Sequence, residues 1–249
     1  MKKYSGYILF LLIWSCAKDN APDCLQLSGE IITRDYSLDG FERILVNENI
    51  ELTLKMGSEY HLKIEAGEHL IHDVEYNVSD GLLTLSDNNQ CNWIRRYAPT
   101  KIIVTTPSLT EIRSNTQHTI SSGGVLTFPS LNLISENFNQ DDLSSGDFNL
   151  HIQNESIKVI SNNLSQFFIS GQTDALFVGF YAGTTAFFGA DLEANHITVY
   201  HRSSHDMVVN PQESLSGELR STGHLISTRT PATVDVQAFY TGTVIFLID

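Results

Sequence analysis

Histidine and aspartate side chains precede apolar positions at several points in the second half of the chain, and both types can bind a divalent metal or a sugar. They are His118, Asp141, His205, Asp206 and His224. If neighbouring segments stack as strands about 4.8 Å apart, two such side chains could share one cation. However, these residues belong to widely separated segments, and solvated turn residues account for them more simply. We therefore predict no metal site and no cofactor.

Paired carboxylates would offer a second chemistry, because glycoside hydrolysis uses two of them about 5–5.5 Å or 6.5–9.5 Å apart. Asp141 with Asp142 and Asp191 with Glu193 are candidate pairs. A polysaccharide lyase would also need a basic residue opposite an acid cluster, and four arginines are available: Arg113, Arg202, Arg220 and Arg229. A chain with 29 acidic residues contains close pairs by chance. Because no spacing marks an acid–base group, we predict no catalytic residues and keep a carbohydrate-active enzyme as the alternative.

The best candidate for a binding patch combines aromatic and guanidinium side chains in one short segment: Trp93, Arg95, Arg96 and Tyr97. An exposed aromatic ring beside arginines can stack on a sugar ring or hold an anionic group. Alternatively, the two aromatic rings fold back on the body of the protein and have a structural role only.

A repeating pattern between Pro107 and about Thr228 would have to position the candidate histidines and carboxylates. Each repeat joins an apolar alternation to a small polar turn residue and then to an apolar anchor. The expected anchors are Ile120, Leu143, Ile169, Phe188, Val208 and Ile226. The alternations, expected to stack in columns, include Leu131, Leu133, Ile157, Val159, Leu176, Val178, Ile197 and Val199. A period of roughly twenty residues is typical of solenoids.

A single repeat of this kind cannot fold alone. Its few inward apolar side chains contribute roughly 1.5–3 kcal/mol each on burial, whereas ordering the backbone costs roughly 1–2 kcal/mol per residue. Stacking covers both faces of a repeat and pairs its backbone with its neighbours. Because β-branched and aromatic residues are frequent and no helical period is present, we predict an all-β stack of coils. An antiparallel sandwich with strands at similar spacing is the alternative.

The first half of the body, from Gly29 to Pro107, also has the alternation of strands, with a hairpin signal at Asp80-Gly81. These strands are either the first coils of the stack or a separate cap. A cap would cover strand edges that an open end exposes.

The start of the chain has the pattern of an export signal. Lys2 and Lys3 precede an apolar stretch, Tyr7 to Trp14, that is too short to cross a membrane. The run Ile13-Trp14-Ser15-Cys16 resembles the cleavage site of a bacterial lipoprotein signal, in which Cys16 becomes lipidated. An ordinary secretory signal cut near Cys16 is the alternative.

This pattern divides the chain into three parts. We predict a signal peptide over residues 1–15, a tether over residues 16–28 that holds the protein to a membrane through its lipid, and one folded domain over residues 29–249. Attachment by two or more acyl chains would be stable.

Two cysteines, Cys24 and Cys91, remain once Cys16 carries the lipid. In an oxidising compartment such an even pair can form a disulfide. On the chain-entropy model the bridge would contribute roughly 4 kcal/mol. Two free thiols are the alternative.

The whole chain carries a formal net charge of −14. Nucleic-acid binding requires a basic footprint, which this composition lacks. We therefore predict no nucleic-acid partner.

Several runs of the sequence resemble one protein family. They are Phe41-Glu42-Arg43-Ile44, Ile50-Glu51-Leu52-Thr53-Leu54, Asp80-Gly81-Leu82-Leu83-Thr84-Leu85 and Pro107-Ser108-Leu109-Thr110-Glu111-Ile112, with closing runs at residues 230–234 and 240–244. Together they are similar to the head GIN domain (DUF2807, an auto-transporter adhesin family) of Bacteroidetes lipoproteins. The resemblance implies a right-handed parallel β-helix-like solenoid without catalytic residues, and an adhesive role. Glycine remains in the turns only at Gly183 and Gly223, so we expect a turn surface different from that of the family.

The pair Lys18-Asp19 after the lipid cysteine resembles the export tags of surface lipoproteins, so we predict an outer-membrane lipoprotein exposed at the cell surface. We predict a non-catalytic cell-envelope module, an adhesin that binds a glycan or protein ligand. The alternatives are a carbohydrate-active enzyme on a β-helix scaffold and an envelope structural or accessory protein with a dedicated partner.

Overall fold

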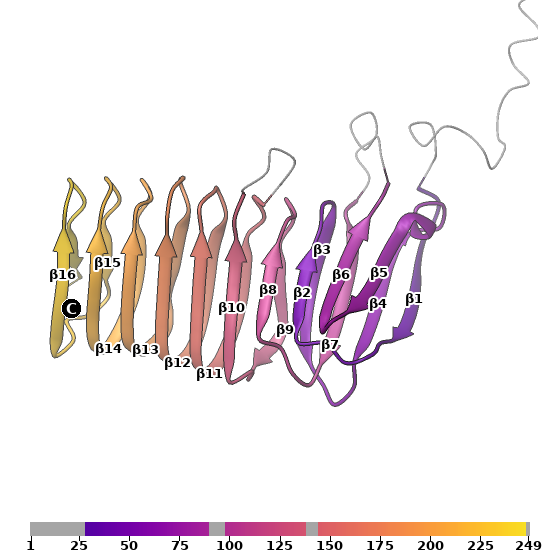
Figure 1. The fold of residues 1–249 in the computed structure, drawn as a ribbon, viewed down its shortest axis with the longest axis horizontal. Coiled ribbons are helices and arrows are strands. Elements are labelled where there is room, and N and C mark those ends of the chain that lie inside the picture. Colours follow the sequence, from indigo (N-terminus) through magenta and orange to yellow (C-terminus); the bar gives the residue numbers. More distant parts are fainter. Residues whose placement is uncertain (1–27, 90–97, 138–143, 248–249) are drawn as a thin grey trace, which may run out of the picture.

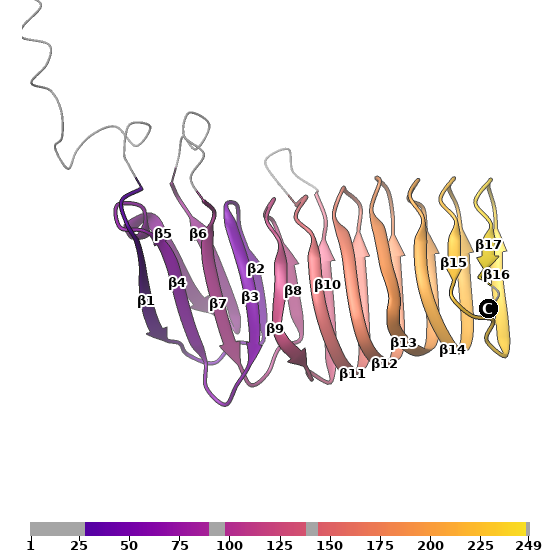
Figure 2. The same cartoon turned by 180° about the vertical axis from the view of Figure 1, so that it is seen from behind.

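The computed structural model describes residues 28–89, 98–137 and 144–247. Its 17 strands belong to one curled sheet, and the strands lie side by side as a stack (Figures 1 and 2). The strands before residue 107 are β1 (Ile31–Ser37), β2 (Arg43–Val46), β3 (Ile50–Met56), β4 (His61–Gly67), β5 (Val74–Ser79), β6 (Leu82–Asp87) and β7 (Thr100–Thr106), with a 3-10 turn, η2 (Ile71–Asp73), between β4 and β5. The later strands are β8 (Glu111–Ser114), β9 (Ile120–Leu126), β10 (Ser130–Ser135), β11 (Phe148–Ser161), β12 (Gln166–Phe180), β13 (Ala186–His201), β14 (Met207–Leu219), β15 (Leu225–Ser227), β16 (Thr233–Ala238) and β17 (Val244–Phe246).

The parallel strands form two rows. The row that we call the first face runs β7–β3–β9–β11–β12–β13–β14–β15–β17, and the second face runs β6–β2–β8–β10–β11–β12–β13–β14–β16. The long strands β11 to β14 belong to both rows, because their first halves pair on the first face and their second halves pair on the second. The pairing of these coils is parallel, so the antiparallel sandwich is wrong for this part of the chain.

The predicted apolar columns are present on the second face. Leu131 pairs with Ile157, Ile157 pairs with Leu176, and Leu176 pairs with Ile197 on successive coils. The neighbouring column joins Leu133, Val159, Val178 and Val199 in the same register. All of these side chains are buried. Parallel pairing brings equivalent residues of successive coils together, so one apolar position per repeat becomes a continuous core.

The expected anchors of the first face are wrong by one residue at three places. Phe188, Val208 and Ile226 pair in register but point outward, and Phe188 is 40% exposed. The buried column consists instead of Ile120, Phe148, Phe167, Phe187, Met207 and Leu225. Where two apolar residues are adjacent, as at Phe187 and Phe188, the sequence does not show which of them points into the core. A shift of one residue moves a side chain to the other side of a strand.

The first half of the body both continues the stack and closes its end. β2 and β3 pair parallel with β8 and β9, and β2 lies between β6 and β8 although it precedes both in the chain. β4 and β1 then add antiparallel strands beyond β7, and β5 adds one beside β6. The outer strand β1 alternates exposed and half-buried residues and contains Arg34 and Asp35. Charges on an edge strand oppose pairing with another chain.

Buried polar side chains fill the turns between the second face and the first. Asn163 is the centre of this network: its Nδ2 donates to Ser135 Oγ at 2.9 Å, and its Oδ1 accepts from Ser161 Oγ at 3.0 Å and from the Ser165 amide at 3.0 Å. Ser135 and Ser165 also bond to each other at 2.6 Å. The network satisfies polar groups that would be costly to bury alone.

The predicted signal, tether and cysteines, including Cys16, Cys24 and Cys91, lie outside the described residues. Within the described part of the chain, no helix has the length and apolar character needed to span a membrane.

Candidate functional site

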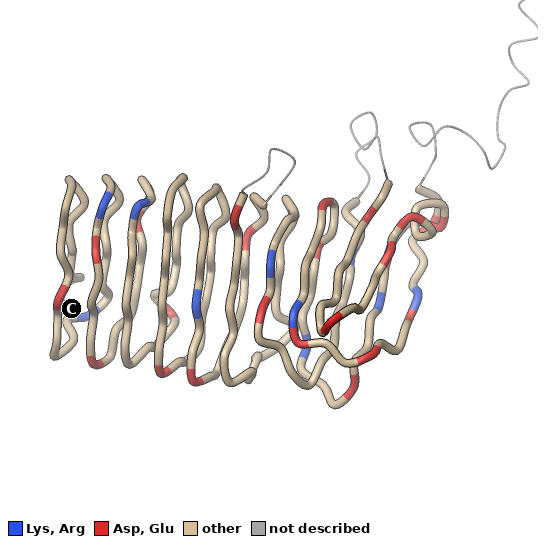
Figure 3. The backbone as a smooth tube through the Cα atoms, viewed as in Figure 1, with Lys and Arg blue, Asp and Glu red and all other residues tan. Residues whose placement is uncertain are grey.

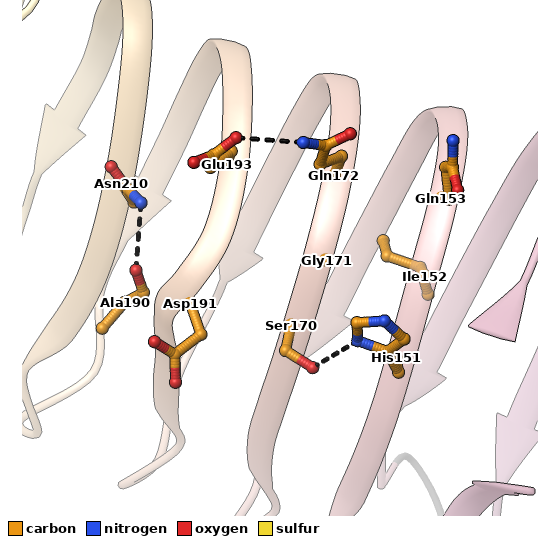
Figure 4. Close-up of a pocket in the computed structure, with 10 residues that line it drawn as sticks. All are labelled: His151, Ile152, Gln153, Ser170, Gly171, Gln172, Ala190, Asp191, Glu193 and Asn210. Atoms are coloured by element: carbon orange, nitrogen blue, oxygen red, sulfur yellow. Dashed lines mark hydrogen bonds between the residues drawn. The ribbon is translucent and has the colours of Figure 1, made fainter. Parts of the chain in front are cut away.

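A groove with a volume of about 530 Å³ crosses the first halves of four neighbouring strands, β11 to β14 (Figure 4). Its lining residues are His151, Ile152, Gln153, Ser170, Gly171, Gln172, Ala190, Asp191, Glu193 and Asn210. The groove lies where the long strands pass from the first face toward the second.

A change of register opens the groove. Phe168 pairs with Phe188, but Gly171 pairs with Leu192, so β13 contains an extra residue between these positions. β13 contains even more extra residues relative to β14, because Phe188 pairs with Val208 whereas Glu193 pairs with Asn210. A bulge of this kind bends a strand and redirects its side chains. On the other side of the groove, Gly171 has φ +109°, and an added Cβ would lie 1.9 Å from the Ile152 carbonyl oxygen. Only glycine permits this close approach of two coils.

Polar side chains form a row along the groove. Gln153, Gln172, Glu193 and Asn210 occupy paired positions on successive strands. Gln172 Nε2 donates to Glu193 Oε2 at 3.1 Å, and Asn210 Nδ2 donates to the Ala190 carbonyl at 3.0 Å (Figure 4). Because strands repeat about every 4.8 Å, the row presents a regular series of donors and acceptors.

A second, shorter row lies beside the first. His151 Nδ1 and Ser170 Oγ hydrogen-bond at 2.9 Å, and Asp191 lies on the bulge next to them (Figure 4). The groove thus offers amide, hydroxyl, imidazole and carboxylate groups, which are the groups that bind sugar hydroxyls.

An exposed aromatic pair lies on the same strands, just before the groove. Phe168 and Phe188 are 39% and 40% exposed and stack with ring centroids 4.8 Å apart. Their row continues outward on the following coils through Val208, Ile226 and Ile245. Such a ledge of apolar side chains can carry the apolar face of a ligand whose polar groups enter the groove.

Asp191 and Glu193, one of the two candidate carboxylate pairs, line the groove, but both side chains come from the same strand and are exposed. Glu193 is held by Gln172 rather than by a basic residue. Asp141 and Asp142 lie outside the described residues.

The described residues among the candidate metal ligands come from three turns, with His118 in one, His205 and Asp206 in a second and His224 in a third. Asp206 Oδ1 accepts from the His224 amide at 2.8 Å, whereas the His205 amide donates to Ser203 Oγ at 3.2 Å. Burial lowers the pKa of His118, and the charges of Glu51 and Asp87 raise it by less. Among residues 28–89, 98–137 and 144–247, no three His, Cys, Asp or Glu side chains are arranged to hold a metal ion.

His201 has the most perturbed environment among the described histidines. It is fully buried at the end of β13, and neither ring nitrogen meets the geometry of a hydrogen bond within the described residues. Burial lowers its pKa to about 4, and the nearby backbone of His224 and the charge of Asp206 offset only part of this effect. The ring is therefore neutral at pH 7 and belongs to the core, next to Phe180.

The four arginines considered for lyase chemistry are spread over the stack. Arg113 lies 3.7 Å from Glu136, and Arg229 bonds to Gln212. Arg202 and Arg220 lie on neighbouring coils at the end of the second face. Figure 3 shows acidic residues distributed along the stack, with basic residues scattered between them. The predicted patch of Trp93, Arg95, Arg96 and Tyr97 lies outside the described residues.

The family model with the description "Putative auto-transporter adhesin, head GIN domain" matches residues 40–231. This chain belongs to the head GIN domain family. The family resemblance drawn from the sequence runs is confirmed.

Solved structures share the fold of this head GIN domain. A "putative adhesin" from Bacteroides fragilis NCTC 9343 has a TM-score of 0.77 and 19% identity, with 88% of this chain and 97% of that chain covered. A "Putative lipid binding protein" from Parabacteroides distasonis ATCC 8503 has a TM-score of 0.62 and 13% identity, with 88% and 98% covered. A "putative adhesin" from Parabacteroides merdae ATCC 43184 has a TM-score of 0.62 and 14% identity, with 88% and 97% covered. At these identities the likeness shows the fold alone. A search of curated proteins finds no match.

Most of the groove was missed by reasoning from the sequence of this head GIN domain. Gln153, Gln172 and Glu193 recur at the repeat spacing and could have been aligned as a polar column. The turn residues alone do not give this column, because the bulge in β13 shifts the register between the turns and the groove.

Proposed function

We propose that this protein is a non-catalytic binding module of the cell envelope, an adhesin that holds a glycan in the groove across β11 to β14. The observation that carries the proposal is the in-register row Gln153–Gln172–Glu193–Asn210 beside the exposed Phe168–Phe188 ledge. Sugars present hydroxyls at their edges and C–H groups on their faces, so amides beside aromatic rings complement both. Family membership and the names of the solved relatives support an adhesive role.

We further propose that the protein folds as a right-handed parallel β-helix. Parallel pairing of coil upon coil supports it, and the twist of β-strands favours right-handed crossover connections. A flat, rigid face of this kind positions side chains on strands rather than on loops, which lowers the entropy cost of binding.

We propose that the protein is attached to the outer membrane through a lipid on Cys16, with its folded body at the cell surface. The signal pattern of residues 1–16 and the Lys18-Asp19 pair support this location. Metabolic labelling with a fatty-acid analogue tests it: a Cys16→Ser variant should lose the label, and label retained on that variant would contradict lipidation at Cys16.

Binding experiments on the folded body test the ligand. The protein should bind members of a panel of neutral oligosaccharides at micromolar concentration. A Gln172→Ala/Asn210→Ala variant should lose at least tenfold in affinity, and Phe168→Ala should also weaken binding. Asn77→Ala, an exposed residue of β5, serves as the matched control and should leave affinity unchanged. Absence of neutral-glycan binding to the intact protein would contradict the proposal, as would binding that the groove variants do not alter.

A carbohydrate-active enzyme is the second candidate, because Asp191 and Glu193 both line the groove. Incubation with polysaccharides should then release reducing ends or unsaturated products, and Asp191→Asn or Glu193→Gln should abolish that release. If instead one stoichiometric protein partner co-purifies and no glycan binds, an envelope accessory role is favoured over both candidates.

A further inference from the structure

Four exposed side chains form a row at the end of the second face, away from the groove. Tyr181, Arg202, Arg220 and Phe239 follow the last paired residues of successive coils. The amide of each donates to a carbonyl of the preceding coil, at 2.9 Å for Tyr181 and 2.8 Å for the other three. The row therefore places two arginines side by side with an aromatic ring at each end.

Aromatic contacts fix the position of Arg220. Its Cζ lies 4.3 Å from the ring centroid of Phe239 and 5.8 Å from that of Tyr200. Tyr200 in turn lies against Tyr181, with ring centroids 5.1 Å apart. Guanidinium groups stacked on rings keep their edges free for hydrogen bonds.

The charges of this row are only partly balanced. Arg220 Nε is paired with Glu218, but within the described residues its terminal nitrogens have no hydrogen-bond partner. The Arg202 side chain has neither an ion pair nor a hydrogen bond within the described part of the chain. Like charges on adjacent strands are unfavourable unless an anion compensates them, and Glu218 compensates only one of these two arginines.

We propose that Arg202 and Arg220 bind the carboxylate of an acidic glycan, such as a uronate, whose sugar faces rest on Tyr181, Tyr200 and Phe239. The backbones of Arg202 and Arg220 lie on neighbouring coils, one strand spacing apart, so their long side chains can both reach one carboxylate through charge-assisted hydrogen bonds. Aromatic rings on both sides complement the C–H faces of a pyranose ring, which a peptide carboxylate lacks. This inference rests on the proposed binding role but not on the groove.

Titration with oligogalacturonate tests the site, with its neutral methyl ester as the paired probe. The intact protein should bind the acid form at least tenfold more tightly than the ester, and added salt should weaken the difference. Arg202→Gln and Arg220→Gln should each reduce affinity for the acid at least tenfold. Tyr181→Ala should weaken both probes.

Arg113→Gln is the matched control, because it removes the same charge from an arginine paired with Glu136 on another coil. It should change affinity by less than twofold, and thermal unfolding should be equal for all variants. Equal binding of acid and ester, or acid binding that Arg202→Gln and Arg220→Gln leave intact, would overturn the inference. Neutral glycans bound at the groove without any acid binding would overturn this inference alone and leave the proposed function standing. A matrix protein whose binding requires both arginines, with no uronate binding, would replace the glycan by a protein partner.

Discussion

Phe168 and Phe188 stack on the outside of the protein, with an angle of 9° between their rings, while Phe167 and Phe187 of the same two strands are buried. One residue therefore separates a core position from a surface position. The outer pair lies next to the groove and belongs to a row of outward apolar residues that spans five coils from β12 to β17. This exposed row on the first face is the surface that the proposed glycan in the groove would contact.

Substitution of the two phenylalanines of β13 should separate these roles. Phe187→Ala should lower the free energy of unfolding by about 3–5 kcal/mol, because it leaves a cavity in the core. Phe188→Ala should lower it by only about 1 kcal/mol, the value of an exposed aromatic contact. Urea denaturation measures both. Equal losses for the two variants would contradict the register described for β13.

Gly171 should be far more sensitive to substitution than another glycine with positive φ. Gly171→Ala should cost about 3 kcal/mol or more, because the added Cβ meets the Ile152 carbonyl and the backbone is strained. Gly124→Ala is the control: its φ is +154°, but no atom lies within 4 Å of the added Cβ, so about 1 kcal/mol is expected. Thermal unfolding compares them. If the two variants unfold alike, the close approach of β11 and β12 is incorrect.

His201 should make stability depend on pH. The unfolded chain binds a proton at this residue below pH 6.5, whereas the folded chain binds it only below about 4. The contribution of neutral His201 to the free energy of unfolding is therefore fully present above pH 6.5. It is lost as the pH falls toward 4, which lowers the free energy of unfolding by roughly 3 kcal/mol.

The variant His201→Leu should remove that part of the pH dependence, since Leu219 already occupies the paired position on the next coil. Free energies of unfolding at pH 7 and pH 4.5 give the comparison. A His201→Leu variant with unchanged pH dependence would show that His201 is not the titrating group.

Asn163 should contribute more to stability than its neighbour Asn162. Asn163→Ala removes three hydrogen bonds at a buried site and leaves the Ser165 amide without its Asn163 acceptor, at a cost of about 3 kcal/mol. Asn162→Ala removes bonds to the Asn137 backbone at an exposed site, so about 1 kcal/mol is expected. Urea denaturation of both variants is the measurement. A larger loss for Asn162→Ala would contradict the buried network.

The cysteine pair Cys24 and Cys91 should form a disulfide in the exported protein. Thiol titration in denaturant should find no free thiol when Cys16 is replaced by Ser, and two after reduction. Loss of the bridge should lower stability by roughly 4 kcal/mol on the chain-entropy model. Two titratable thiols before reduction would establish the alternative.

The sequence by itself determined the all-β class, the family and the inward columns Leu131–Ile197 and Leu133–Val199. Each of these follows from local information, because alternation sets which residues can be buried together and the repeat period sets which coils they come from. Family membership also followed from short runs such as Phe41-Glu42-Arg43-Ile44.

Only the tertiary structure decided the register of the first face, the place of β2 between β6 and β8, and both candidate binding surfaces. A turn of variable length or a bulge such as that of β13 shifts one strand against its neighbour without changing the local pattern. Side chains far apart in the chain, such as Gln153 and Asn210 or Tyr181 and Phe239, then share a surface. Their proximity depends on pairing between coils, which is a property of the folded chain as a whole.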